Sequence, residues 1–220
     1  TSIDRSATYY KVLKSNTQFK LGLNVCPDIS KEMHMYHLYS TDDSFTFFTL
    51  DEAMFQFACG IYLAEVKIPL DAEIINTERS LSSKILVTKI TPLIEFFNSQ
   101  TESFKRRSVS AYGANIRHIR NPSKELQIIA VTQLYNGINY IIDPDEEVQL
   151  ASVKRWAHTI SYINNPSEIV QQAAVSANGY AIQYIKNPSR KVQELAVRSK
   201  PDAIAYIPKE KQWADLKMFF

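Results

Sequence analysis

The chain has 220 residues, of which 45% are hydrophobic and 22% charged, and its net charge is +2. This length is enough for one large domain or two small ones. No apolar run approaches the roughly 18–20 residues that cross a bilayer, and the chain does not begin with a signal-peptide pattern. Cys26 and Cys59 are too few for a disulfide framework and indicate buried thiols. We therefore expect a soluble, cytoplasmic protein.

Charge is unevenly distributed along the chain. Residues 1–104 hold 9 Lys and Arg against 13 Asp and Glu, whereas residues 105–220 hold 16 against 10. A basic half is compatible with binding to nucleic acid or to an acidic protein, and also with an ordinary solvated helical surface.

The first 80 residues predict a small α+β domain. Short runs rich in aromatic and β-branched residues predict strands at Tyr9–Leu13, Phe45–Thr49 and Ile61–Ile68. Thr49 and Glu52 have the spacing of a capping box, which would begin a helix through Ala53–Phe57 with Met54 and Phe57 facing inward.

A bridging helix is expected between this domain and the rest of the chain, within residues 81–101. Ser82 or Ser83 would begin it, and it would run from Lys84 to about Asn98.

Residues that carry chemistry are sparse in this region. His34 and His37 lie three apart but lack a nearby third metal ligand, and Glu65 is more simply ion-paired than catalytic. The sequence contains no Gly-rich phosphate loop and no nucleophile motif. We therefore predict no catalytic residue, no metal site and no cofactor.

A repeat of 22 residues dominates the second half of the chain. Its prolines keep this spacing without a slip, and each follows Asn or Asp: Asn121-Pro122, Asp143-Pro144, Asn165-Pro166 and Asn187-Pro188. Because Asn and Asp are favoured N-caps and proline is tolerated at the first helical position, this pattern predicts four helix starts.

Other positions recur with the same spacing. Gln follows each proline by five residues and Val by nine, at Gln127, Gln149, Gln171 and Gln193, and at Val131, Val153, Val175 and Val197. Apolar offsets of four, seven and eight predict one face of a helix of about 11 residues.

An Ile/Tyr/Ile cluster ends each repeat and predicts a second helix of about two turns. Its tyrosines are Tyr140, Tyr162, Tyr184 and Tyr206. Asn136-Gly137 and Asn178-Gly179 mark the turn between the two helices. With a degenerate first copy from about residue 102, we expect a solenoid of near five helical hairpins over 102–220, covered at its end by Trp213, Met218, Phe219 and Phe220.

The repeated Gln and Tyr columns allow two interpretations. They could form a binding ladder, or Gln could bind backbone between repeats while Tyr packs its ring with the hydroxyl at the surface. Residues that do not vary between repeats favour architecture, so the varied, exposed basic positions are the better binding candidates. These are Arg117, Arg120, Lys154, Arg155, His158, Arg190, Lys191 and Arg198.

The repeats resemble the tandem 22-residue Asn-Pro-Ser repeats of unknown function in large DNA viruses, phages and some intracellular bacteria. The third repeat carries the pattern best, in Asn165-Pro166-Ser167-Glu168, Gln171, Ala174-Val175 and Asn178-Gly179-Tyr180. The first half resembles the small domain that precedes ankyrin or similar repeats in giant-virus and phage proteins, through Tyr10-Lys11-Val12, Gly22-Leu23-Asn24-Val25, Leu38-Tyr39-Ser40-Thr41 and Tyr62–Pro69. These resemblances imply a viral or phage origin and no established activity.

The first half is also similar to ADP-ribosyltransferases of the poly-ADP-ribose type. Leu38-Tyr39-Ser40, Ala53–Phe57 and Ala64-Glu65-Val66 match the order of a strand, a helix and a strand that line an NAD pocket in that family. The usual His-Gly of the pocket has no counterpart here.

Three functions follow. The first is a non-catalytic interaction protein of viral or phage type that binds a host or partner protein through the solenoid, for example to block a host defence. The second is a nucleic-acid-binding protein that uses the basic half. The third is an ADP-ribosyltransferase-like domain with a solenoid for target choice. No membrane contact is expected, and the oligomeric state is left open.

Overall fold

The computed structural model describes residues 3–14, 19–25, 46–76 and 80–212. It combines antiparallel sheets with helices, so the chain belongs to the mixed α+β class, as predicted. Two compact parts divide it: an N-terminal part of Thr1–Ala111 with His118–Arg120, and a C-terminal part of Tyr112–Arg117 with Asn121–Phe220. Within the described ranges, no helix has the length and apolar character needed to span a membrane.

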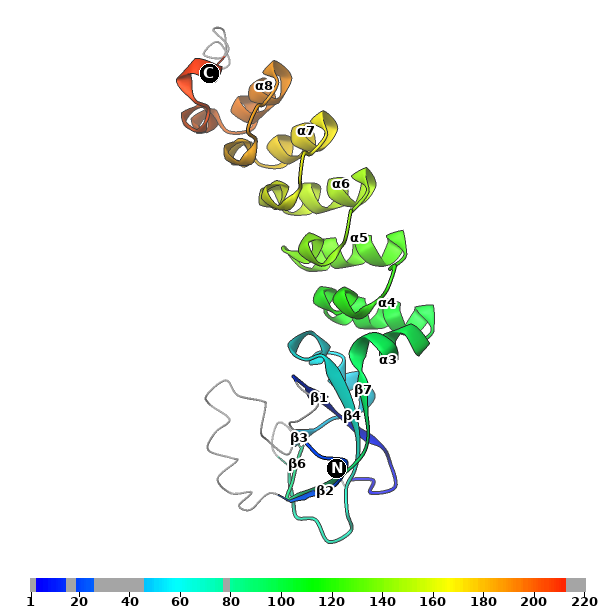
Figure 1. Ribbon diagram of the computed structural model, residues 1–220. Helices are drawn as coiled ribbons and strands as arrows, with labels where there is room; N and C mark the ends of the chain where they lie inside the picture. Colours follow the sequence, from blue (N-terminus) through cyan, green and yellow to red (C-terminus); the bar gives the residue numbers. More distant parts are fainter. Residues whose placement is uncertain (1–2, 15–18, 26–45, 77–79, 213–220) are drawn as a thin grey trace. The chain divides into compact units, whose positions relative to one another are not determined.

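A four-stranded antiparallel sheet forms the centre of the N-terminal part (Figure 1). Its strand order is β1 (Tyr9–Leu13), β4 (Tyr62–Lys67), β7 (Lys84–Pro92) and β2 (Gly22–Val25). One apolar core cluster of the sheet contains Leu13, Ala64, Val66, Ile85 and Val87. Burial of this surface is the main stabilising contribution that the sheet makes.

A second, three-stranded sheet has the order β3 (Thr46–Phe47), β6 (Ser80–Ser82) and β5 (Ile74–Asn76). The three strands predicted from sequence are therefore present, as β1, β3 and β4, although β3 is shorter than predicted. Several residues singled out in the sequence lie outside the described ranges: Cys26, His34, His37, Leu38-Tyr39-Ser40, Phe45, Trp213, Met218, Phe219 and Phe220.

The bridging helix predicted from Lys84 is wrong over its first nine residues, because these form β7. The segment alternates between the buried Ile85 and Val87 and the more exposed Leu86 and Thr88, which is the two-residue period of a strand. Helix α3 (Leu93–Ser99) begins only after Pro92. Ser82 and Ser83 therefore precede a strand and cap no helix.

Aromatic rings pack around α3 at one end of the N-terminal part. The capping box of α2 (Leu50–Ala53) is confirmed, and Met54 and Phe57 are buried as predicted. The predicted helix through Ala53–Phe57 is wrong, because α2 ends at Ala53 and Phe57 begins the 3-10 helix η2 (Phe57–Cys59). Phe97 of α3 contacts several rings edge-on or stacked, those of Phe57, Phe96, Phe104 and His118. Phe104 belongs to α4 (Glu102–Ala111).

Cys59 is exposed, so the prediction of a buried thiol is wrong there.

Four ten-residue helices recur at 22-residue intervals in the C-terminal part. They are α5 (Lys124–Gln133), α6 (Glu146–Arg155), α7 (Glu168–Ala177) and α8 (Arg190–Ser199), and each packs against the next (Figure 1). Valines at the predicted nine-residue offset are fully buried in all four, at Val131, Val153, Val175 and Val197. These helices therefore share one apolar packing pattern.

The N-caps lie two residues later than predicted. Asn121, Asp143 and Asn165 adopt positive φ angles of 47°, 49° and 51°, a left-handed conformation that Asn and Asp tolerate. The residue after each proline caps the helix instead, by accepting a hydrogen bond from a backbone N–H in the first turn: Ser123, Asp145, Ser167 and Ser189. Asn or Asp therefore ends the preceding turn, and proline connects it to the cap.

The second helix of each repeat is of the 3-10 type. These elements are η4 (Gly137–Tyr140), η5 (Ala157–Tyr162), η6 (Gly179–Tyr184) and η7 (Pro201–Tyr206), and each packs against the next. The predicted two turns are present in η5, η6 and η7, whereas η4 is shorter. A further 3-10 helix, η3 (Gly113–His118), precedes α5, and η8 (Lys209–Lys211) follows η7. Gly179 has an ordinary φ, and the reason for glycine there is close packing, since a Cβ would lie 2.3 Å from the Ala196 carbonyl oxygen.

Candidate binding surface

The Gln that recurs every 22 residues binds the backbone of its own repeat. The side-chain amide of each Gln donates to the carbonyl of the proline five residues earlier, at 2.9 Å for Gln127, 2.8 Å for Gln149, 2.9 Å for Gln171 and 3.2 Å for Gln193. The bond fixes the proline turn onto the first turns of the helix. The architectural interpretation of the Gln column is therefore supported. The predicted bond to backbone beyond the repeat is present at Gln193, whose amide also donates to the Lys211 carbonyl at 2.8 Å, whereas the bonds described for Gln127, Gln149 and Gln171 stay within their own repeats.

Adjacent repeats are joined by a different contact, between the first residue of one helix and the N-cap of the next. Lys124 lies 2.9 Å from the Asp145 carboxylate and also pairs with Glu147. In the following repeats the polarity is exchanged: Ser167 donates to Glu146, and Ser189 donates to Glu168 at 2.6 Å. We call this series the cap ladder; its pairs are Lys124–Asp145, Glu146–Ser167 and Glu168–Ser189.

Charge on the first step of the cap ladder follows from its geometry. The hydrogen bond from Lys124, and then that from the Val148 N–H, lower the pKa of Asp145 below its usual value. The same carboxylates raise the pKa of Lys124 above its usual value, with Asp145 the larger cause and Glu147 the next. Both groups are therefore charged together near neutral pH.

All eight residues that the sequence nominates for binding are exposed, but the structure separates them. Arg190 and Lys191 lie at the N-terminal end of α8, and Arg190 is paired with Glu194 at 2.9 Å. Lys154 and Arg198 occupy equivalent positions in the last turns of α6 and α8. Arg120 belongs to the N-terminal part.

The remaining three, Arg117, Arg155 and His158, each contact an aromatic ring. The Arg117 guanidinium lies 5.8 Å from the centre of the Tyr140 ring, and that of Arg155 lies 4.1 Å from the Trp156 ring. His158 lies 5.7 Å from Tyr135, ring centre to ring centre. Each is therefore held beside an aromatic side chain by a cation–π or ring contact.

The tyrosine column lies on the 3-10 helices and is only partly covered. Tyr162, Tyr184 and Tyr206 are 44%, 46% and 49% exposed, and Tyr140 is half-buried beneath Arg117. Tyr180, at the start of η6, meets Tyr206 of the next repeat edge-on with ring centres 5.7 Å apart. At the equivalent position earlier in the chain, His118 is buried and bonded to the Phe57 carbonyl oxygen. Three of the four tyrosines in this column are therefore considerably exposed.

We define the tyrosine edge as the surface formed by these side chains at the turns after α5 to α8 and along η3 to η7. Its members are Arg117, Tyr135, Tyr140, Arg155, Trp156, His158, Tyr162, Tyr180, Tyr184, Lys200 and Tyr206. Lys200 belongs here because it follows α8 at the position that Trp156 occupies after α6, and its backbone packs close to Gly179. The Lys and Arg residues of the tyrosine edge, Arg117, Arg155 and Lys200, come from alternate repeats.

Acidic residues of α5 to α8 lie mostly at the N-terminal ends of the helices, which also hold the cations Lys124, Arg190 and Lys191. The first two turns of α5 to α8 with their caps hold six acidic residues: Glu125, Asp145, Glu146, Glu147, Glu168 and Glu194. The tyrosine edge lies within the stretches 112–117, 132–142, 154–164, 176–186 and 198–208. These stretches hold six Lys or Arg and one acidic residue, Asp202. Acidic first turns and basic last turns both suit the helix dipole, so this arrangement also stabilises the helices.

The sequence search missed the cap ladder, Lys200 and the exposure of the tyrosines. A signal for the ladder was present, because the one acidic cap, Asp145, is preceded 21 residues earlier by the one Lys at that position, whereas Ser caps are preceded by Glu. Lys200 could have been found by aligning it with Trp156. Tyrosine exposure depends on the exact width of a 3-10 helix and had no signal.

In the N-terminal part, a small open cavity lies between β1, β3 and η2. Lys11, Val12, Lys14, Thr46, Phe48, Gln56 and Cys59 line it. Lys11 is only 2% exposed, with its ammonium 3.4 Å from the Thr46 hydroxyl and 5.2 Å from the centre of the Phe19 ring. Of the described residues that carry the ADP-ribosyltransferase resemblance, Gln56 lies in this lining.

Glu65 lies on β4 and is paired with Lys89 of β7 at 3.6 Å, as predicted. It also acts on a neighbour: burial, and to a smaller degree the Glu65 carboxylate, raise the pKa of Tyr10. The described residues contain no group of three His, Cys, Asp or Glu side chains placed to hold a metal ion.

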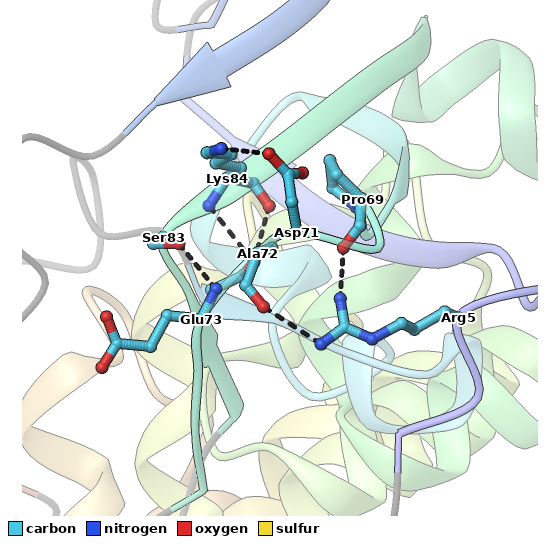
Figure 2. A network of polar contacts seen from close by, with 8 residues as sticks. Arg5, Pro69, Asp71, Ala72, Glu73, Ser83 and Lys84 are labelled. Atoms are coloured by element: carbon cyan, nitrogen blue, oxygen red, sulfur yellow. Dashed lines mark hydrogen bonds and ion pairs between the residues drawn. The ribbon is translucent and has the colours of Figure 1, made fainter.

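A polar network secures the turn between β4 and β5 (Figure 2). Arg5 donates to the carbonyl oxygens of Pro69 and Ala72, the second at 3.0 Å. Lys84 pairs with Asp71 and lowers the pKa of that carboxylate. These contacts use main-chain acceptors and a paired carboxylate, so the network stabilises the turn.

Comparison with protein-family models, curated proteins and solved structures finds no match to this chain. The resemblances to viral and phage repeats and to ADP-ribosyltransferases therefore remain hypotheses.

Proposed function

We propose that the protein is a non-catalytic binding protein whose residues 102–209 form a solenoid of 22-residue helical repeats that holds a partner protein. In this proposal the repeats provide a rigid framework, and side chains that differ between repeats make the contacts. The protein would act in the cytoplasm, as the viral or phage resemblance implies, with a host protein as the partner.

One observation carries the proposal: the repeated polar side chains are used within the framework. Each Gln binds the proline carbonyl of its own repeat, and each cap binds its own helix. In contrast, positions that vary between repeats, such as Arg155 and Lys191, are exposed. This division of labour is typical of repeat proteins that bind through an extended surface.

Affinity capture with the full chain as bait, from a lysate of the host cell, tests the proposal. We expect one protein to be enriched with the wild-type bait and lost with baits that carry charge reversals on one exposed face. Two matched baits cover the two faces: Arg155→Glu/Lys200→Glu on the tyrosine edge, and Lys154→Glu/Lys191→Glu on the outward face of the helices. If no protein is enriched, or if neither pair alters the enrichment, the proposal fails.

Nucleic-acid binding is the second candidate, because the tyrosine edge combines cations with aromatic side chains. A binding constant that falls steeply with salt, and falls further in the Arg155→Glu variant, would support it. An ADP-ribosyltransferase activity has less support, and an NAD-dependent rise in the unfolding midpoint of the full chain would be needed to revive it.

A further inference from the structure

Three candidate sites stand out beyond the framework: the Lys11 cavity, the N-terminal ends of α5 to α8, and the tyrosine edge. The interactions of Lys11 extend beyond those described for the cavity, and the charges at the start of α5 and α6 are paired in the cap ladder. The tyrosine edge instead combines exposed aromatic side chains with an excess of positive charge. It is therefore the candidate that points to a ligand.

We propose that the tyrosine edge binds single-stranded nucleic acid, with bases stacked on Tyr162 and Tyr184 and phosphates held by cations such as Lys186. The inference adds a second ligand to the proposed protein partner and does not depend on that partner. It develops the nucleic-acid candidate by naming the rings, the charge and the form of the strand.

The first tyrosine of the column shows how a planar group fits on such a ring. The Arg117 guanidinium, from the preceding 3-10 helix, lies 5.8 Å from the centre of the Tyr140 ring. Tyr140 is half-buried, whereas Tyr162 and Tyr184 are 44% and 46% exposed. Arg117 is thus an internal occupant of this ring position. A ring that accepts a guanidinium can equally accept a base, which is also planar.

The later tyrosines lack this covering group. At the position of Arg117 in the following repeats stand uncharged residues: Asn139, Ser161 and Gln183. Within the described ranges, Tyr162 and Tyr184 have no ring or cation contact. Tyr206 differs, because Tyr180 of the preceding repeat meets its ring edge-on. Two rings one repeat apart are therefore left for bases.

Charge decides between the ligands that could stack on these rings. The stretches that hold the tyrosine edge contain six Lys or Arg and one acidic residue, Asp202. An arginine-rich peptide could stack on tyrosine, but these cations would repel it. An acidic peptide would pair with the cations and leave the exposed rings without stacking partners. A nucleic acid supplies both planar bases and a phosphate for each nucleotide.

Stacking also determines the form of the strand. The bases of a duplex are already stacked and paired, so a tyrosine reaches their faces only in a single strand. Tyr162 and Tyr184 occupy the same position, the last residue of η5 and of η6, and these two elements pack against each other. Adjacent repeats can thus take successive bases, as in repeat proteins that bind one base per repeat. Because every base has a flat face, we expect weak sequence preference.

Lys186 is the cation that lies nearest in sequence to an exposed ring. It is exposed and follows Tyr184 by two residues, just after η6. Arg155 and Lys200 are also exposed and directly precede the turns into η5 and η7. Contacts of these cations with phosphates would weaken as salt is added, independently of base sequence.

The experiment measures the fluorescence anisotropy of fluorescein-labelled oligonucleotides with the full chain. The probes are oligo-U and oligo-dT of about 15 nucleotides and a duplex of about 15 base pairs, at about 0.15 M salt so that contacts to phosphate alone are weak. We expect at least one single strand to bind with a dissociation constant about fivefold or more below that of the duplex. The tighter of the two single strands identifies RNA or DNA as the ligand.

Two variants of the rings test the stacking. Tyr162→Ala/Tyr184→Ala should raise the dissociation constant of the single strand about tenfold or more, because two stacked bases lose their rings. Tyr162→Phe/Tyr184→Phe keeps the rings and removes the hydroxyl groups, and should stay within about twofold of the wild type. Thermal unfolding verifies that each variant is folded; Tyr184→Ala alone, with a rise of about threefold, replaces the double variant if it is not.

A pair of charge reversals tests the phosphate contacts. Lys186→Glu should weaken binding of the single strand more than Lys191→Glu, which makes the same change of charge at the start of α8. An equal effect of both would show that only the overall charge matters and would overturn the assignment of Lys186.

Four results would overturn the inference as a whole: no binding of either single strand, equally tight binding of the duplex, unchanged binding in the Ala variant, or equal loss in the Phe variant. An oligo-Glu peptide of about 15 residues that displaces the strand as well as unlabelled oligonucleotide does would also overturn it, since the surface would then accept any polyanion. The proposed function fails separately, because partner capture repeated after nuclease treatment of the lysate requires no nucleic acid.

Discussion

The two parts of this protein hold their structure by opposite means. In the N-terminal part, the four-stranded sheet depends on pairing between segments that are distant in sequence; β1 pairs with β4 about 50 residues away, with Tyr9 opposite Val66. In the C-terminal part, the main contacts are made within one 22-residue repeat or with the next. Local contacts make a structure tolerant of changes in its length, whereas distant pairing makes it depend on a few central residues.

The largest effect is expected from Phe97→Ala, which should break the N-terminal part alone. Phe97 is fully buried and contacts four rings, so its removal should cost about 3–5 kcal/mol. Amide hydrogen exchange should show faster exchange in β1 and β4 with protection retained in α7. Phe55→Ala, at a 60% exposed position, is the control. Equal loss of protection in both parts would show that they unfold as one unit.

A smaller effect is expected from Gly179→Ala in the C-terminal part. The added Cβ would lie 2.3 Å from the Ala196 carbonyl oxygen, and the overlap should cost about 1–3 kcal/mol. Ala157 occupies the equivalent position one repeat earlier. Ala157→Gly should therefore lower the free energy of unfolding by less than about 1 kcal/mol. Urea denaturation followed by far-UV circular dichroism compares them. Similar costs for both substitutions would contradict the packing role assigned to Gly179.

Ser167→Ala tests how much one repeat depends on its neighbour. The change removes the cap of α7 and the bond to Glu146, and about 1 kcal/mol should be lost. Exchange should increase at the start of α7 and at the start of α6, where Glu146 lies, and little in α8. Ser176→Ala, at an exposed position of the same helix, should be neutral. Uniform destabilisation of all four helices would contradict the local character of these contacts.

The smallest effect concerns pH and distinguishes the first step of the cap ladder from the others. The pKa of Asp145 is lowered in the folded protein, so its contribution is fully present above its ordinary value of 3.8 and is lost as pH falls through the lower folded value. Lys124→Glu/Asp145→Ser converts this step to the Glu–Ser form. The unfolding midpoint of the double variant should therefore fall less between pH 5 and pH 2 than that of the wild type. Parallel curves would show that the ion pair contributes nothing.

Prediction from sequence succeeded where a local rule decides the structure. The capping box at Thr49 and Glu52 and the strand at Tyr9–Leu13 are present as predicted, and the buried positions of the repeats follow the helical period. It failed at Lys84–Pro92, where Ser82 and Ser83 resembled helix caps but sheet pairing with β4 decides the outcome. It also misplaced the caps by two residues, because the left-handed conformation of Asn165 before Pro166 competes with a capping role.

The candidate surface was predicted less completely than the fold. Exposure of all eight basic residues is confirmed, yet their grouping depends on which end of a helix each occupies. Sequence offsets alone could have separated Lys191 from Arg155. The contacts of Arg155 with Trp156 and of Arg117 with Tyr140 depend on side-chain directions that offsets do not contain.

The pairs of the cap ladder match some neighbouring repeats and not others. If residues 166–187 were deleted, Glu146 would meet Ser189, and a Glu–Ser joint would be restored. If residues 144–165 were deleted, Lys124 would meet Ser167, and the ion pair would have no acceptor carboxylate. Two excisions of the same length therefore differ in outcome. Loss of a copy at a Glu–Ser joint therefore keeps the cap contact, whereas loss of a copy at the Lys–Asp joint removes it.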